Sequence, residues 1–408
     1  MPSFYHRYWA YSDWRQWQLN LVGEHKFTDA LKVKTRLFYV NHSDGIMDVS
    51  WDAEHTTGGK KWFEESYYDD SSIGGEIQAL MNMGQRNSLR FGLNYMKDNH
   101  KEGNYLSDDC WDVLKGSASV GWTPEEEYAA HTYTFAVEDE FRPFNRFSVV
   151  LGLSYDAFEP TQTSDQPAPG QMDIVNPQVG MTFDMTDATR FHVSVGQKSR
   201  FPSLKELYST YGGGNPDLDP EKALAYEAGA SHIFSENVTG KAAFFYHNVD
   251  DLIDSTKLDG ESVYININEA TIYGAEATVG MQLSRAFHTD LNYTYLTTAD
   301  KSNNDRELEG RPRHRVNLAL TYRCAFGLTL NMQASYTKRQ YWENDNYEWT
   351  KLPDYFLINA KLTQKLKKIG GIDAEVFLQG TNILDEDYYE TNGPEPGFNL
   401  LAGISLRM

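Results

Sequence analysis

The 408-residue sequence has two cysteines, little positive charge and no long hydrophobic run. No stretch approaches the roughly 18 apolar residues that a membrane helix needs, and the mean hydropathy is −0.59, so a helical membrane protein is excluded. Cys110 and Cys324 lie far apart and match no metal-binding or redox spacing. The 37 basic residues face 58 acidic ones, and the net charge of −21 argues against a nucleic-acid partner, because phosphates would be repelled.

Aromatic residues and glycine are plentiful instead. Aromatics make up 14% of the chain although apolar residues as a whole reach only 40%, and there are 31 glycines. Low hydropathy with many aromatics leaves two candidates, a soluble all-β protein and a transmembrane β-barrel.

The spacing of apolar residues favours the barrel. Between residues 315 and 323 every second residue is apolar, from Val316 to Tyr322, and the positions between them are polar or small. This alternation indicates strands with one apolar face and one wet face. The runs last about ten residues, which is long enough to cross a bilayer when tilted. Aromatic residues gather near the ends of the runs, as membrane-interface girdles require. A soluble sandwich or propeller is the alternative.

The pattern predicts seventeen antiparallel strands, whose connections alternate between short and long. Short periplasmic turns and long external loops are the arrangement of outer-membrane barrels. The predicted strands are 16–24, 31–41, 72–83, 87–97, 127–138, 145–155, 174–184, 188–196, 223–233, 238–254, 263–282, 286–298, 312–323, 328–340, 354–365, 371–381 and 398–407.

Acidic residues are concentrated in the long connections, which together carry a net charge of −24. Solubility of exposed loops explains this charge. Divalent cations bridging to lipopolysaccharide, or a Ca²⁺ bound within a loop, are alternatives. Clusters such as Asp69-Asp70 and Asp108-Asp109 lack the spacing of an EF-hand loop. We therefore expect no resident cofactor.

No catalytic constellation stands out. His42 and His55 share a long connection with several carboxylates, but histidines scattered at random among acidic loops would give the same picture. No phosphate-binding loop, dinucleotide-binding motif or CxxC motif is present. We expect the protein not to be an enzyme.

Several motifs, in order, resemble those of TonB-dependent outer-membrane receptors. The first three resemble that family's FRAP/NPNL region, and the others resemble its YGxE strand, its GxPxH strand start and the element before its last strand. The motifs are RFPSLKELY at 200–208, NPDLDPEK at 215–222, YEAG at 226–229, IYGAE at 272–276, GRPRH at 310–314 and GTNILDEDY at 380–388.

The resemblance implies an antiparallel transmembrane barrel of about 22 strands with a plugged lumen. Seventeen strands is an odd number, whereas bacterial single-chain barrels have an even one. Residues 1–5 are strand-like and resemble no signal peptide. We therefore expect residues 1–408 to be one receptor barrel domain that lacks the first five strands and the plug, as in a split or truncated receptor.

The family's function implies a receptor in the bacterial outer membrane. Such receptors bind a scarce metal chelate (a ferric siderophore, cobalamin or haem) and import it with energy from TonB–ExbB–ExbD delivered through the plug. Outer-membrane lipid and lipopolysaccharide would surround the barrel. A passive, solute-specific channel and a surface adhesin are the alternatives.

We expect substrate contacts in the external loops. The connection 197–222 has no net charge and would repel an anionic ferric complex least. No histidine lies between Phe201 and Asn215, which favours a siderophore or cobalamin over haem. Exposed aromatics elsewhere would either meet a ligand or pack on each other. The predicted contact residues are Arg200, Lys205, Tyr208 and Tyr211 in this connection and Tyr105, Trp111, Trp342, Tyr347 and Trp349 in two others.

The strand count also separates the two cysteines. It places Cys110 in an external loop and Cys324 in a periplasmic turn. The bilayer core between them is about 30 Å thick, and a disulfide tolerates Cα separations of only about 4.4–6.8 Å. The two thiols are therefore expected not to pair.

Overall fold

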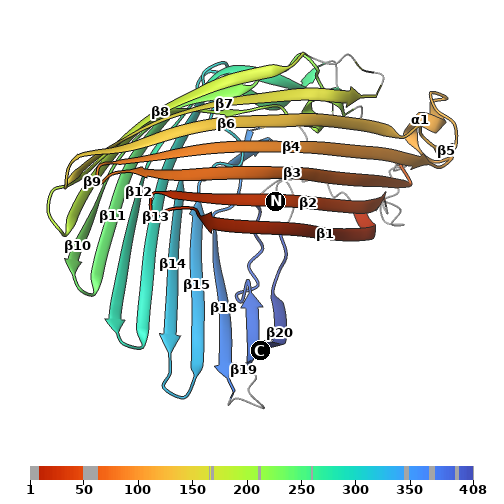
Figure 1. The fold of residues 1–408 in the computed structure, drawn as a ribbon. Helices are drawn as coiled ribbons and strands as arrows, with labels where there is room; N and C mark the ends of the chain where they lie inside the picture. Colours follow the sequence, from red (N-terminus) through yellow and green to blue (C-terminus); the bar gives the residue numbers. More distant parts are fainter. Residues whose placement is uncertain are drawn as a thin grey trace.

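The chain folds into one large antiparallel sheet with little other structure (Figure 1). The computed structural model describes residues 9–48, 63–164, 166, 170–209, 213–258, 261–343, 349–366, 373–390 and 395–407. The predicted all-β, antiparallel architecture is confirmed.

The sheet contains seventeen long strands and one short strand, β5, within the described ranges. The long strands are β1 (Trp9–Lys26), β2 (Leu31–Asp48), β3 (Glu65–Met83), β4 (Asn87–Leu106), β6 (Glu126–Phe144), β7 (Phe147–Thr163), β8 (Met172–Asp184), β9 (Thr189–Arg200), β10 (Glu221–Ser235), β11 (Val238–Leu258), β12 (Glu261–Ser284), β13 (Phe287–Asp300), β14 (His314–Arg323), β15 (Leu328–Lys338), β18 (Tyr355–Lys365), β19 (Asp373–Thr381) and β20 (Asn399–Arg407).

The long connections contain the remaining elements. β5 (Gly121–Trp122) pairs with the end of β4, and β16 (Tyr341–Glu343) forms a hairpin with β17 (Trp349–Lys351). Two short helices, α1 (Trp111–Leu114) and α2 (Leu204–Tyr208), lie in the connections after β4 and β9.

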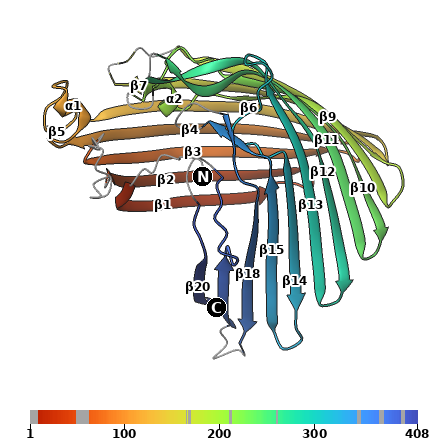
Figure 2. The ribbon, with the colours of Figure 1, turned by 180° about the vertical axis from the view of Figure 1, so that it is seen from behind.

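Each long strand pairs with the next long strand along the chain. In the described residues β1 pairs only with β2 and β20 only with β19, so these two strands form the edges of the sheet. Figures 1 and 2 show the sheet curving into a trough, in which the first strands run in a different direction from the last ones. The short turns lie at one end of the strands and the long connections at the other, as predicted.

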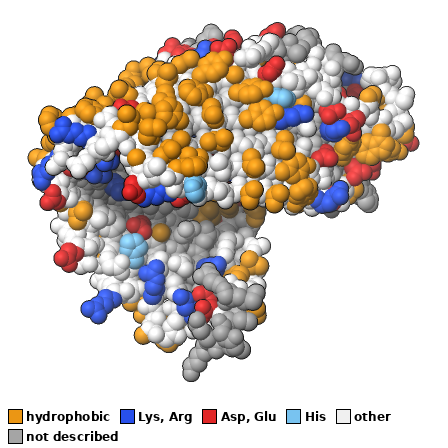
Figure 3. Space-filling model, viewed as in Figure 1, with side chains coloured by type: hydrophobic (Ala, Val, Ile, Leu, Met, Phe, Trp, Pro, Cys, Tyr) orange, Lys and Arg blue, Asp and Glu red, His pale blue; other side chains and the backbone are white. Residues whose placement is uncertain are grey.

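The two faces of the sheet differ in polarity. On β6, Tyr133, Phe135 and Val137 share one face, whereas Thr134 and Glu138 share the other. Tyr133 and Phe135 are exposed, which is unfavourable in water and normal against lipid tails. Figure 3 shows that hydrophobic side chains cover the convex outer face. The convex face is therefore the lipid-facing one, and the concave face lines the lumen.

Aromatic side chains mark the two limits of the lipid-facing band. At the external limit, the rings of Tyr95 and Tyr133 lie 5.4 Å apart, and Tyr246 contacts both Tyr226 and Tyr273. We use the name tyrosine girdle for the following residues: Tyr95, Tyr133, Tyr155, Tyr226, Tyr246, Tyr273, Tyr293 and Tyr336. Exposed aromatics at the other limit include Phe141, Phe183, Phe234, Tyr322 and Phe326.

The spacing between the two limits fits a membrane-spanning segment. Tyr133 and Phe141 are eight residues apart on β6, as are Tyr226 and Phe234 on β10. Residues beyond the tyrosine girdle lie outside the membrane-spanning segments. Among the described residues, no helix is long and apolar enough to cross a membrane.

The cysteines lie as predicted, at opposite ends of the strands, and neither forms a disulfide. Cys110 lies next to α1 at the external end, fully buried beside Phe63 and Leu106. Cys324 begins the turn between β14 and β15.

Candidate functional site

The candidate site lies at the external mouth, where the connection from β9 to β10 covers the lumen-facing side of β6 and β7. Ser203 begins α2 as its N-cap, because its hydroxyl accepts a hydrogen bond from the Glu206 backbone N–H at 3.2 Å. The Glu206 carboxylate accepts a reciprocal bond from the Ser203 N–H at 2.7 Å, which completes a capping box. This local sequence explains why a helix forms in an otherwise extended chain.

Arg200 closes the base of this connection. Its guanidinium donates to both oxygens of Glu206, at 2.8 and 3.1 Å, and to both oxygens of Glu221, at 3.0 and 2.7 Å. Bidentate pairs of this kind are strong because both partners are charged. Burial raises the pKa of Glu206, but the bonds from Arg200 and Ser203 outweigh it and the pKa is lowered. The positive charge of Arg200 is thus matched by carboxylates within the chain.

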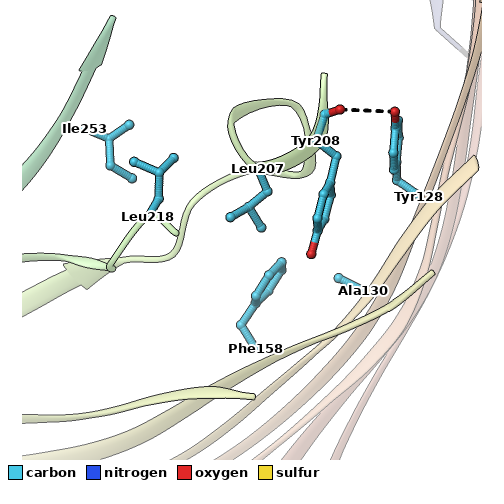
Figure 4. Close-up of a cluster of buried hydrophobic side chains, with 7 residues drawn as sticks. All are labelled: Tyr128, Ala130, Phe158, Leu207, Tyr208, Leu218 and Ile253. Atoms are coloured by element: carbon cyan, nitrogen blue, oxygen red, sulfur yellow. Dashed lines mark hydrogen bonds between the residues drawn. The ribbon is translucent and has the colours of Figure 1, made fainter. Parts of the chain in front are cut away.

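Tyr208 anchors α2 inside the mouth (Figure 4). Its side chain is fully buried and its ring stacks on that of Tyr128 at 5.5 Å, with 12° between the planes. The Tyr128 hydroxyl donates to the Tyr208 carbonyl oxygen at 3.2 Å. Leu207, Leu218 and Phe158 belong to the same cluster.

The Tyr208 hydroxyl is the polar exception in this apolar cluster. It has no hydrogen-bond partner within the described part of the chain. Burial alone raises the pKa of Tyr208 to about 12. A buried hydroxyl without a partner costs stability, so packing of the ring must account for its place in the cluster.

The stack continues along the lumen-facing wall. The ring of His100 lies 6.0 Å from that of Tyr128, and the two planes are nearly parallel at 11°. On the other side of His100, the ring of Tyr68 lies 6.1 Å from the imidazole. His100 Nδ1 lies 2.6 Å from Asp70, and its Nε2 lies 3.5 Å from Glu102. We call the series Tyr68, His100, Tyr128 and Tyr208 the mouth ladder.

The carboxylates make His100 a cation. His100 is five residues beyond Tyr95 on β4 and therefore outside the membrane-spanning segment. Burial lowers its pKa, but the hydrogen bonds with Asp70 and Glu102 more than offset this and raise the pKa to about 9. The second oxygen of Glu102 is buried without a hydrogen-bond partner among the residues described. Tyr128 and Tyr208 are buried, whereas Tyr68 and His100 are partly exposed, so the wall offers the Tyr68 ring and the His100 imidazolium to the lumen.

The predicted contact residues fall into separate clusters. Tyr208 and Arg200 belong to the connection just described, and Lys205 is exposed on α2. Tyr105 contacts Trp122, with ring centroids 5.5 Å apart. Trp111 lies in α1, but its side chain is outside the described part.

The third cluster lies on the β16–β17 hairpin. Trp349 stacks on Tyr341 at 6.1 Å and carries the Arg306 guanidinium over its ring at 4.4 Å. Trp342 lies in β16. Tyr347 and Tyr211 lie outside the described residues. A ligand-binding role for all nine residues stays a prediction.

A hollow of about 630 Å³ also lies on the wall, lined by residues of strands from β2 to β9. Lys32, Lys34, Arg90 and Glu138 line it, and Arg90 pairs with Glu138. Throughout the described ranges, no group of three or more His, Cys, Asp or Glu residues is arranged to hold a metal ion.

Comparison with known proteins gives a consistent result. Residues 1–383 match the family model described as TonB dependent receptor-like, beta-barrel. The vitamin B12 transporter BtuB of Photobacterium profundum is 26% identical over 52% of the chain and 34% of its own length. The probable TonB-dependent siderophore receptor PiuA of Acinetobacter baumannii is 20% identical over 93% of the chain and 59% of its own length.

The fold is also similar to solved structures. The copper transporter OprC superposes with a TM-score of 0.77 at 18% identity, over 98% of this chain and 66% of that one. The chain thus spans between a third and two thirds of the length of these similar proteins.

Proposed function

This chain belongs to the family of TonB-dependent receptors, and from that premise we propose that it takes part in the import of a scarce metal chelate across the bacterial outer membrane. A ferric siderophore or cobalamin is the substrate class that we favour over haem. Energy would come from TonB–ExbB–ExbD through a plug. Two relatives support this class, since one is named a vitamin B12 transporter and the other a probable siderophore receptor.

The observation that carries the choice of substrate is the mouth ladder. Four aromatic or imidazole rings follow one another on the lumen-facing side of the mouth. Tyr128 and Tyr208 are buried, so the partly exposed rings of Tyr68 and His100 are the ones that a ligand can reach. Ring faces stack well on flat, conjugated ligands, and aromatic chelating groups and corrin rings have such faces. Lys205 adds a cation next to the ladder, and it has no ion pair in the described ranges.

Transport dependent on TonB tests this function. Uptake of radiolabelled ferric siderophores and cobalamin would be measured in cells with and without the gene, in backgrounds with and without TonB. We expect uptake of one chelate that requires both genes. A passive channel would transport without TonB, and an adhesin would give no uptake in either background, so each result would reject the proposal.

Lys205 offers a test of the charge of the substrate. Replacing it with glutamine removes one charged contact, of about 1 kcal/mol at an exposed position, and should weaken binding of an anionic ferric complex about fivefold. Cobalamin carries no strong negative charge and serves as the comparison ligand. The matched control is Lys361→Gln, which removes a lumen-facing lysine that lies over the Phe377 ring. Equal affinity in both variants would exclude Lys205 from the site.

A further inference from the structure

We propose that two Lys–His pairs on the lipid-facing side of the barrel bind phosphate groups of lipopolysaccharide in the outer leaflet. One pair, Lys97 and His131, joins β4 and β6. The other pair, Lys338 and His314, joins β15 and β14. The proposal is independent of what the receptor imports.

The first pair lies directly beyond the tyrosine girdle. Lys97 and His131 are opposite each other in the register of β4 and β6. Lys97 follows Tyr95 by two residues, so both side chains share the lipid-facing side. His131 Nδ1 lies 3.2 Å from the Tyr95 hydroxyl and 3.3 Å from that of Tyr133.

The second pair repeats this arrangement on another part of the wall. Lys338 and His314 are opposite each other in the register of β15 and β14. Lys338 follows Tyr336 by two residues, as Lys97 follows Tyr95. His314 Nδ1 lies 2.9 Å from the Tyr293 hydroxyl, and the two rings are stacked at 6.2 Å.

Both pairs are placed at the level of lipid headgroups. Two residues along a strand correspond to about 6.6 Å, so the pairs lie one side-chain step beyond the tyrosines. Tyrosine rings mark the membrane–water interface. Apolar residues continue the same face below the tyrosines, with Leu93 on β4 and Ala334 on β15. A lipid bound here would touch the cations with its headgroup and the apolar band with its acyl chains.

The lysines are available for such a ligand. In the described ranges neither Lys97 nor Lys338 takes part in an ion pair. The nearby cation Lys101, by contrast, is held by Glu125 and Glu127.

Lys338 helps to lower the pKa of the Asp354 carboxylate. Asp354, however, is already bonded to Lys351 at 2.9 Å and to the Arg339 N–H at 3.0 Å. A lysine beside the hydrocarbon region is costly unless it meets an anion. The missing partner is thus expected to be supplied by the membrane.

The chemistry of the pairs fits a phosphate group. A phosphate carries up to two negative charges and three acceptor oxygens. When a tyrosine hydroxyl donates to Nδ1, the neutral imidazole carries its proton on Nε2 and can donate it to a ligand. Each pair then offers an ammonium and an imidazole N–H to one oxyanion. Glu159 is opposite His131 in the register of β6 and β7, on the other side of His131 from Lys97. Lysine and histidine on adjacent strands thus form a two-donor site.

Native mass spectrometry of the full chain in detergent tests the proposal. The probe is lipid A with both phosphates, and the comparison ligands are dephosphorylated lipid A and inorganic phosphate. The variants are Lys97→Gln with His131→Gln, Lys338→Gln with His314→Gln, and all four substitutions together. We expect each double variant to lose one bound lipid A and the fourfold variant to bind at least about tenfold more weakly.

Controls separate the sites from general charge and folding. Lys361→Gln removes the same charge from the lumen-facing side and should leave lipid A binding unchanged. Lys97→Arg and Lys338→Arg should preserve it, because arginine also binds phosphate. Heat-modified migration on gels checks that every variant is folded.

Two results would overturn the proposal. Equal binding of dephosphorylated lipid A would show that acyl chains alone hold the lipid. Displacement by inorganic phosphate alone would show a site for free phosphate. Chelate uptake by the fourfold variant, measured separately, distinguishes failure of this proposal from failure of the proposed function.

Discussion

His100 and His131 lie on neighbouring strands near the same external end of the sheet but face opposite sides. His100 faces the lumen, lies between Asp70 and Glu102, and is charged because the hydrogen bonds with these carboxylates hold its pKa at about 9. His131 faces lipid, and in the described residues its ring hydrogen-bonds with the hydroxyls of Tyr95 and Tyr133.

The comparison shows how a barrel wall assigns two roles to one residue type. The decisive partners come from adjacent strands: Asp70 lies on β3 beside His100, and Tyr95 lies on β4 beside His131. Alternation of side chains along a strand decides whether a histidine faces the lumen or the lipid. The register with the adjacent strand decides which side chain it hydrogen-bonds with.

The most disruptive change to the lumen-facing side is Tyr208→Ala. It removes the ring that anchors α2 against Tyr128, and truncation of a buried aromatic costs about 3–5 kcal/mol. We expect faster hydrogen exchange of the backbone amides in α2. Tyr208→Phe is the control, because it keeps the ring and removes only a hydroxyl without a hydrogen-bond partner in the described ranges. Similar exchange in both variants would contradict the packing role.

His100→Gln should have the next largest effect, and it should depend on pH. The pKa of His100 in the folded state, about 9, exceeds its ordinary value of 6.5. The charged ring therefore stabilises fully below pH 6.5, and this contribution is lost as the pH rises through about 9. A pKa shift of this size corresponds to a contribution on the order of 3 kcal/mol to the free energy of unfolding.

Urea unfolding of wild type and His100→Gln between pH 6 and pH 10 measures this contribution. Burial also raises the pKa values of Tyr68, Tyr128 and Tyr208, so the neighbouring rings keep their protons longer than free tyrosine does. Asp70→Asn should remove part of the same pH dependence. A constant difference between wild type and His100→Gln across the range would show that the ring is not charged.

Arg200→Gln is expected to loosen the base of the β9–β10 connection by about 1–2 kcal/mol. Breaking a buried ion pair costs more, but the Arg200 side chain is 44% exposed and solvent screens part of the interaction. The lowered pKa of Glu206 means that its contribution is present above pH 4.5 and lost as the pH falls. Hydrogen exchange of α2 at pH 7 and pH 4 measures both effects, and Lys205→Gln serves as the control.

His131→Gln should have the smallest effect on stability. It removes the hydrogen bonds between the imidazole and two tyrosine hydroxyls at the membrane interface, which contribute about 1 kcal/mol. Folding into lipid vesicles, followed by urea titration, measures the change. A loss as large as that of His100→Gln would remove the distinction between the two faces.

Much of the fold follows from sequence alone, because a transmembrane strand imposes period-two alternation. All seventeen predicted strands are present, and the prediction of 87–97 begins where β4 begins. β4 continues to Leu106, however, as several strands extend beyond their predicted external ends. Beyond the membrane both faces meet water or other protein, so the apolar alternation that marks a strand disappears.

The mouth could not be predicted in the same way. The sequence indicates Tyr208 as a ligand contact but contains no local signal that its ring is buried on Tyr128, eighty residues away. His100 and Tyr68 pass unnoticed, and Asp70 is noticed only as part of an acidic cluster, because only cross-strand register brings the three together. The hairpin of β16 and β17 lies within a predicted connection, and its strands of three residues are too short for a periodic pattern.

The eight-residue spacing between the aromatic limits on β6 and β10 also sets the thickness of membrane that the protein tolerates. Eight residues span about 26 Å along a strand, and a tilt of about 40° reduces this to a height of about 20 Å. A bilayer with a core of 30 Å would have to thin around the protein, at a cost for each ångström of mismatch. The protein is thus suited to the thin outer membrane, and hydrophobic mismatch would disfavour it in thicker bilayers.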